Sequence, residues 1–219
     1  MNRLLFSKMG DAVYLSHLDL MRVFQRAFKR AGILIWHSQG FSPRAYVSIA
    51  LPLPVGMESR CEILDFEIED GSVELSQLPE RLNAVLPAGI RVLRAYESER
   101  KIKALTKLSA DVTLEYDRGV PAGAQKALTE LFSRESLVIV KRSKKGDKEV
   151  DIKPLIYALS IAAASETELR IETVLSAQNP GLNPQLLLTA IETYLPEFKP
   201  DFARAGRLEV LDDEENPFR

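Results

Sequence analysis

Residues 16–32 read SHLDLMRVFQRAFKRAG, and this stretch decides what the first part of the chain becomes. Its apolar residues recur every three or four positions, which is the spacing of one face of an α-helix. Ser16 with Asp19 three residues later is a capping-box-like start, and Gly32 is a typical stop signal. The stretch therefore predicts an amphipathic helix that ends at Arg30, with one apolar face and one charged face.

Short apolar stretches on both sides of this helix predict β-strands. The predicted order is strand, helix, strand, strand, helix, strand, and a second series of the same kind follows. The sequence thus predicts an α+β fold of two tandem ferredoxin-like (βαββαβ) units. Their predicted bounds are residues 1–97, which carry the candidate site, and residues 111–219, joined by a linker at residues 98–110 that is rich in lysine and arginine.

Within the second predicted unit, the middle part allows two interpretations. Residues 137–142 and 149–152 are predicted as strands on either side of a polar turn. Residues 154–160 fit either a short helix or an extended segment.

The charge of the chain is unevenly distributed. The net charge is −2, but residues 1–50 contain seven basic and two acidic residues, so this segment carries +5 and the remainder −7. The composition excludes a generally basic nucleic-acid coat and an acidic disordered tail. A positive segment on an otherwise acidic chain favours a polyanionic or carboxylate-bearing ligand at one place, although a solvated helix face would explain it equally well.

Cysteine use and hydropathy define the expected compartment. Cys61 is the only cysteine, so the chain forms no internal disulfide, no CxxC redox pair and no thiolate-bound iron–sulfur cluster of its own. The apolar run at the N-terminus is too short for a signal peptide, and no stretch reaches the roughly 20 apolar residues of a membrane span. We expect a soluble cytoplasmic protein with no membrane contact and no cofactor.

The charged face of the predicted helix carries a ridge of arginines. Arg22, Arg26 and Arg30 follow one another at intervals of four residues, and Asp19 precedes Arg22 by three. Like charges at this spacing repel each other, so a neighbouring group or a ligand should offset the repulsion. Asp19 and solvent suffice in one interpretation; in the other, the planar guanidinium groups capture a phosphate or carboxylate.

His17 is the candidate catalytic residue. It lies in the first helical turn, where the positive end of the helix dipole disfavours protonation of the imidazole. The neutral imidazole could act as a general base, a hydrogen-bond donor or a metal ligand. A structural histidine is the alternative. His17 and His37 are the only histidines and lack the HxxxH or HxH spacing, so no metal site is predicted.

A polar loop follows the helix and supplies further candidate binding residues. Ser38, Gln39 and Arg44 offer donors and acceptors, and Gly40 permits a positive φ. Phe41 is a large apolar side chain within this loop. If exposed it would stack on a base or ring, but aromatic residues in short loops usually plug the core, so the sequence favours an anchoring role.

The stretch at residues 51–59 interrupts a strand pattern with two prolines and a glycine. Glu58 and Glu62 lie beside this rigid turn and complete the set of candidate binding residues. Such a turn fits a pocket wall and a strand crossover equally well.

Three ordered motifs carry a resemblance to a known family. They are SHLDLMR at residues 16–22, SQGF at residues 38–41 and LPLPVG at residues 51–56. Together they resemble the radical-SAM-linked protein family, a bacterial domain of unknown function that is fused to or encoded beside radical SAM enzymes. Since this chain lacks a CxxxCxxC motif, the resemblance implies that a separate radical SAM enzyme acts as partner in trans.

Three functions remain open at this point. The first is a recognition or accessory module that binds RNA or another anionic ligand for a radical SAM enzyme in nucleic-acid modification. The second is a stand-alone enzyme, for instance in RNA cleavage, with His17 as general acid or base. The third is a protein-interaction adaptor. The sequence leaves the oligomeric state open.

Overall fold

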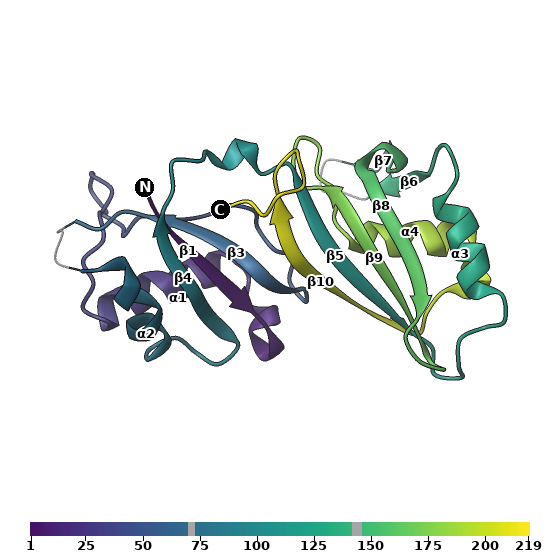
Figure 1. The fold of residues 1–219 in the computed structure, drawn as a ribbon, viewed down its shortest axis with the longest axis horizontal. Coiled ribbons are helices and arrows are strands. Elements are labelled where there is room, and N and C mark those ends of the chain that lie inside the picture. Colours follow the sequence, from purple (N-terminus) through teal and green to yellow (C-terminus); the bar gives the residue numbers. More distant parts are fainter. Residues whose placement is uncertain (70–72, 142–145) are drawn as a thin grey trace. The chain divides into compact units, whose positions relative to one another are not determined.

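The computed structural model describes residues 1–69, 73–141 and 146–219. The chain divides into two compact units (Figure 1). Unit 1 comprises Met1–Ala104 together with Arg219, and unit 2 comprises Leu105–Phe218. Both units combine helices with an antiparallel sheet, so the predicted α+β class is confirmed. Among the described residues, no helix combines the length and the apolar character needed to cross a membrane.

The described residues of unit 1 form four strands and two α-helices, together with three short 3-10 turns. In chain order these elements are β1 (Asn2–Lys8), η1 (Gly10–Tyr14), α1 (His17–Arg30), β2 (Val47–Ile49), β3 (Glu58–Phe66), η2 (Leu75–Gln77), α2 (Leu78–Asn83), β4 (Ile90–Glu97) and η3 (Ile102–Ala104). The strands lie in the order β4-β1-β3-β2, and every neighbouring pair is antiparallel.

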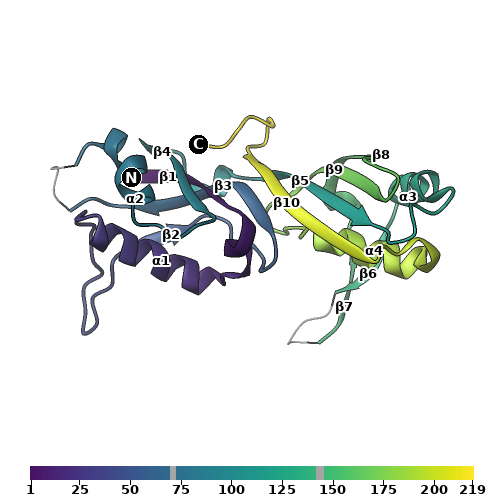
Figure 2. The same ribbon diagram turned by 90° about the horizontal axis from the view of Figure 1, so that it is seen from below.

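The core of unit 1 lies between one face of this sheet and the two helices. Figure 2 shows α1 running along the sheet, where its apolar stripe meets β1 and β3. Phe24 packs edge to face on Phe6 of β1, and Phe28 lies against Phe66 of β3. Leu82 of α2 completes the same cluster. The apolar periodicity of the quoted stretch therefore becomes the seam that attaches α1 to the sheet.

Unit 2 repeats the alternation of strands and helices with one addition. Its elements are β5 (Lys107–Glu115), α3 (Ala124–Phe132), β6 (Val138–Lys141), β7 (Lys148–Asp151), η4 (Lys153–Leu155), β8 (Ile156–Ala163), β9 (Glu168–Ser176), α4 (Gln185–Tyr194), η5 (Pro196–Phe198) and β10 (Phe202–Leu211). The main strands lie in the antiparallel order β10-β5-β9-β8. β6 and β7 pair with each other as a separate two-stranded sheet.

The middle part of unit 2 confirms the extended interpretation and both predicted strands. The segment after Pro154, left open as helix or extended, is β8, which pairs with β9. The strands predicted on either side of the polar turn are confirmed as β6 and β7, and the structure adds that they lie outside the main sheet. The hairpin they form is attached to α4, since the Tyr194 hydroxyl donates to the Val138 carbonyl at 2.7 Å. Alanine-rich β8 shows no clear alternation, which is why its sequence did not identify a strand.

The predicted linker is too long at its C-terminal end, because β5 already begins at Lys107. Leu108 and Ala110 are buried and alternate with half-exposed neighbours, as in a strand with one buried face. The lysine itself is held by partners far away in sequence. Its ammonium donates to the Asp213 carbonyl and to Glu215, each at 3.0 Å, so a charge at this position does not mark a linker.

Candidate functional site

The start of α1 is built as the sequence predicts. The Ser16 side chain accepts a hydrogen bond from the Asp19 amide at 3.2 Å, and its hydroxyl donates to the Asp19 carboxylate at 2.7 Å. Arg22 forms an ion pair with Asp19 at 3.1 Å. The Ser16 hydroxyl and the Arg22 guanidinium hold the pKa of the Asp19 carboxyl below its ordinary value. The acidic residue is therefore committed to the helix start and to one arginine.

The arginine ridge differs from the prediction at its C-terminal end. Arg22 and Arg26 face the same cavity, but their third cationic neighbour is Lys29. Arg30 instead donates to the Val85 carbonyl at 2.6 Å, beside α2. The reason is helical geometry at about 100° per residue: Lys29 lies only about 20° from Arg22 around the axis, whereas Arg30 lies about 80° away.

The polar loop after α1 folds back on itself as a hairpin. His37 bridges Ala45, and the Tyr46 amide donates to the Trp36 carbonyl at 2.8 Å. Nearer the tip, the Ser38 amide donates to the carbonyl of Arg44 at 2.9 Å. We call residues 36–46 the hairpin. Figure 2 shows this narrow loop, in the purple-blue of residues near 40, reaching past α1.

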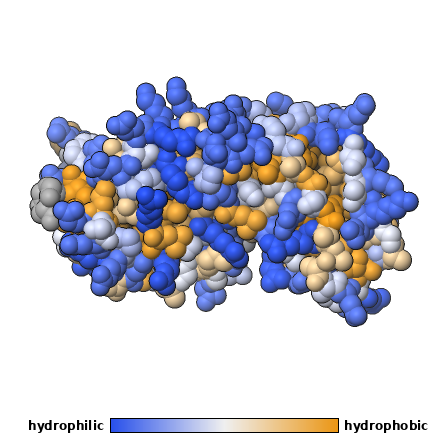
Figure 3. Space-filling view, viewed as in Figure 1, coloured by the Kyte–Doolittle hydropathy of each residue, from blue (hydrophilic) through white to orange (hydrophobic). Residues whose placement is uncertain are grey.

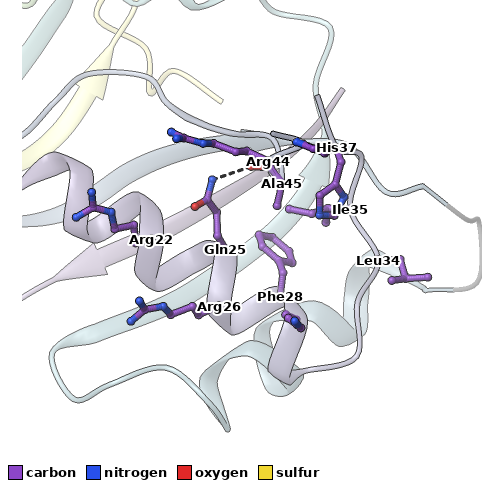
Figure 4. A pocket seen from close by; sticks show the side chains of 11 residues that line it. Arg22, Gln25, Arg26, Phe28, Leu34, Ile35, His37, Arg44 and Ala45 are labelled. Atoms are coloured by element: carbon purple, nitrogen blue, oxygen red, sulfur yellow. Dashed lines mark hydrogen bonds between the residues drawn. The ribbon is translucent and has the colours of Figure 1, made fainter. Parts of the chain in front are cut away.

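Contacts at the base of the hairpin fix it beside α1. Gln25 projects from the middle of the helix and donates to the Ala45 carbonyl at 2.8 Å (Figure 4). On the other side, the Trp36 amide donates to the Glu67 carbonyl at 2.8 Å. Ile35 is buried under this base. The helix and the hairpin are therefore held side by side by hydrogen bonds across long sequence separations.

Two adjoining cavities of about 550 and 540 Å³ lie between α1 and the hairpin, and we call them together the α1 groove. Both are lined by Arg22, Gln25, Arg44 and Ala45. The first cavity adds Arg26, Lys29 and His37, as Figure 4 shows in part. The second adds Leu18, Ser38 and Tyr46. Their volumes fall within the range of small-molecule and cofactor sites, about 300–1,000 Å³.

The groove is cationic and has no acidic lining. Arg22, Arg26, Lys29 and Arg44 contribute positive charge, and neither set of lining residues contains an aspartate or glutamate. Within the described parts of the chain, only Arg22 of these four is paired with a carboxylate. The side-chain donors of Arg26, Lys29 and Arg44 therefore have no carboxylate partner among the described residues.

The tip of the hairpin contradicts the expected anchoring role of Phe41. Phe41 is fully exposed, with a relative accessibility of 112%, and does not belong to the buried core. Gly40 precedes it with φ of 138°, a backbone conformation that suits glycine. Gln39 is exposed at the same tip. The hairpin is closed by its own hydrogen bonds at Ser38 and Arg44, so it needs no aromatic plug.

The two glutamates lie outside the α1 groove. Glu58 begins β3 and accepts a hydrogen bond from the Gly10 amide at 3.3 Å, and Glu62 is buried in the same strand. The proline-rich turn before them runs from β2 to β3, and its Gly56 amide donates to the Val13 carbonyl at 2.9 Å. The turn therefore connects two neighbouring antiparallel strands, so it is neither a crossover nor a wall of the α1 groove.

His17 is half-buried at the first position of α1 and lines neither cavity. His37 lines the first cavity, so the two histidines do not share the groove. In the part of the chain that is described, no three histidine, cysteine, aspartate or glutamate side chains form a group able to hold a metal ion.

Sequence reasoning missed two residues that define the groove. Gln25 is half-buried and joins the helix to the hairpin, and Lys29 extends the cationic row. Lys29 could have been found by following the helix seven residues on from Arg22, which returns to nearly the same side. No local signal identifies the partner of Gln25.

Two solved structures share the fold of this chain. Comparison with a chain of a Cbf5-Nop10-Gar1 complex gives a TM-score of 0.52 at 9% identity, covering 95% of this chain and 48% of that chain. A chain of an H/ACA RNP bound to a substrate RNA containing 2'-deoxyuridine gives 0.50 at 7% identity, covering 95% and 47%. This chain therefore spans about half the length of both, and identities this low show a similar fold alone.

No curated protein matches the sequence. A family model does. Residues 2–184 match the family described as "Uncharacterized protein conserved in bacteria (DUF2344)". The match extends across most of both units, and the chain belongs to this bacterial family.

Proposed function

We propose that this protein is a recognition module that binds RNA in the α1 groove. The observation that carries the proposal is the acid-free cationic lining, in which Arg26, Lys29 and Arg44 have no carboxylate partner among the described residues. Arginine forks bind phosphate through two parallel hydrogen bonds, and a row of cations follows a sugar-phosphate backbone. The groove gathers this charge on a chain whose net charge is −2.

Unpaired RNA fits the groove better than a duplex does. Phe41 stands fully exposed at the hairpin tip, and Trp36 and Tyr46 pack edge to face at its base. Sequence-specific RNA recognition mostly targets single-stranded regions, whose bases stack on aromatic side chains. The hairpin therefore offers a stacking surface beside the phosphate-binding cations.

The fold supports the same class of ligand. The strand order is β4-β1-β3-β2 within unit 1 and β10-β5-β9-β8 within unit 2, and we infer two tandem ferredoxin-like units, the second with β6 and β7 inserted. One of the two similar structures is an H/ACA RNP bound to a substrate RNA. The motifs at residues 16–22, 38–41 and 51–56 support a radical SAM enzyme, supplied in trans, as the partner that modifies the bound RNA.

Loss of two groove arginines tests RNA binding. The Arg26→Ala/Arg44→Ala variant removes two phosphate contacts, so the slope of log K against log salt should fall by about 1.4, at roughly 0.7 per contact for a single strand. Affinity near 0.1 M salt should fall about 10- to 30-fold. The measurement is fluorescence anisotropy with an end-labelled single-stranded RNA at several salt concentrations.

The matched control removes the same charge elsewhere in unit 1. Arg60 and Arg91 are exposed and line neither cavity, so the Arg60→Ala/Arg91→Ala variant should keep the wild-type slope and affinity. Equal losses in both variants would show a diffuse charge effect in place of a groove. An unchanged slope in the Arg26→Ala/Arg44→Ala variant would refute the proposed site.

Truncation of the exposed aromatic separates stacking from charge. Phe41→Ala should weaken single-stranded RNA binding by about 1–3 kcal/mol, the range for loss of one base–aromatic stack, while the salt slope stays at the wild-type value. Phe41→Trp should retain affinity because it restores a ring. If Phe41→Ala binds RNA normally, the tip does not contact bases and the adaptor hypothesis gains this surface instead.

A further inference from the structure

β8 is the outermost strand of unit 2's sheet. It pairs with β9 and with no other strand among the described residues. Just after β8, the Ala164 amide donates to the carbonyl of Glu168, the first residue of β9, at 2.9 Å. By alternation, the backbone groups of Leu159, Ile161 and Ala163 therefore point outward. A side chain confirms this direction: Gln125 donates to the Ile161 carbonyl at 3.0 Å from α3.

The sequence of this edge carries none of the usual blocking residues, although Gln125 of α3 occupies the Ile161 carbonyl. Residues 156–165 read IYALSIAAAS and contain no charged residue, no proline and no glycine. Edge strands are normally blocked by lysines, prolines, bulges or shortness. A register shift at Ile156–Ala158 lies at the start of the strand and leaves the pairing from Ala158 to Ala163 regular.

The outer strands of unit 1's sheet show the contrast. β4 carries Arg91, Arg94 and Glu97, and β2 is only three residues long. Both therefore follow the protective pattern that β8 lacks. Figure 3 shows a hydrophobic patch over the part of unit 2 where Figure 1 draws β8. Tyr157 of β8 is 50% exposed.

We propose that β8 pairs with β8 of a second copy of this chain, antiparallel and about a two-fold axis. In this arrangement the same edge serves both partners, as a two-fold interface requires. The neutral strand places no like charges opposite each other, and its open-face side chains Ala158, Ser160 and Ala162 are small and exposed. Apart from the Ile161 carbonyl, which accepts from Gln125 of the same chain, the outward peptide groups of each copy then find partners in the other.

The charges that flank β8 favour this orientation. Lys153 lies just before the strand and Glu166 follows it, whereas Glu168, at the start of β9, is paired with Arg204 at 3.4 Å. Antiparallel pairing brings the basic end of one copy to the acidic end of the other, whereas parallel pairing would bring like ends together. The Lys153 ammonium donates one hydrogen bond to the Phe132 carbonyl at 2.7 Å, and its other two N–H groups can donate elsewhere.

Sedimentation velocity of the full chain, without RNA, tests the proposal. The wild type should sediment as a species of twice the 24.5 kDa chain mass, with a monomer appearing on dilution. Ser160→Lys/Ala162→Lys should weaken the dimer by at least tenfold, since lysines on the edge strand repel their copies across the axis. The matched variant Ser76→Lys/Ala84→Lys adds the same charge at exposed positions of unit 1 and should stay dimeric.

Hydrogen exchange supplies an independent readout on the unaltered protein. The amides of Leu159 and Ile161 should become protected as concentration rises, because they point into the proposed interface. A wild type that stays monomeric at every concentration overturns the proposal. So does a dimer that Ser160→Lys/Ala162→Lys leaves intact, or one in which those two amides exchange at a rate independent of concentration.

Discussion

Arg3→Ala is expected to lower the free energy of unfolding of unit 1 by about 3–5 kcal/mol, the usual cost of breaking a buried ion pair by removing one partner. The Arg3 guanidinium donates to both carboxylate oxygens of Asp65, at 2.6 and 3.2 Å. It also donates to the Ser98 hydroxyl at 2.9 Å and the Arg100 carbonyl at 3.1 Å. Both charged side chains are buried, with exposures of 1% and 7%.

The size of the effect comes from the partner that remains. Without Arg3, the Asp65 carboxylate stays buried in β3 with no compensating charge, and the Arg100 carbonyl loses a donor. Urea unfolding followed by tryptophan fluorescence measures the loss in unit 1, because Trp36, the only tryptophan, lies in that unit.

A double variant supplies the control. Arg3→Ala/Asp65→Ala removes the stranded carboxylate as well, so it should be more stable than Arg3→Ala alone, and its loss of stability should be smaller than the sum of the two single losses. Simple additivity of the two single losses would contradict the buried bidentate pair. An Arg3→Ala variant that unfolds at the same urea concentration as the wild type would also contradict it.

Phe24→Ala is expected to cost about 3–5 kcal/mol, the range for truncating a buried phenylalanine. Phe24 is completely buried, and its ring meets Phe6 at 4.7 Å between centroids in an edge-to-face arrangement. Truncation leaves a cavity between α1 and the sheet and removes an aromatic pair. Thermal unfolding followed by tryptophan fluorescence should show a lower midpoint.

Leu18 provides the matched control on the same helix, because its side chain is 62% exposed. Leu18→Ala should change stability by no more than about 0.5 kcal/mol. A similar loss in both variants would indicate that helix propensity dominates over packing. If Phe24→Ala left the midpoint unchanged, the proposed seam between α1 and β1 would be incorrect.

The helical half of the candidate site was predictable because it depends on local order. The Ser16 cap, the apolar stripe and the positions of Arg22 and Arg26 all follow from spacing along one helix. Arg30 does not line the groove because a spacing of eight residues drifts around the axis, and its partner, Val85, is distant in sequence.

The hairpin half of the site depended on contacts that spacing does not encode. Gln25 finds the Ala45 carbonyl across 20 residues, and Phe41 is exposed because hydrogen bonds at Ser38 close the hairpin without it. Composition suggested an anchoring role for Phe41. Burial is a property of the assembled surface, so residue type alone could not decide it.

The sequence by itself determined the α+β class, the capped amphipathic helix α1 and the basic character of the first fifty residues. These properties rest on hydrogen bonds and periodicities within a few residues. Only the tertiary structure decided that β8 is an edge strand, that β6 and β7 leave the main sheet, and that the cations face a hairpin. Neighbouring strands and the two sides of the groove come from segments that are far apart in sequence. They stabilise each other only once folding has brought these segments into contact.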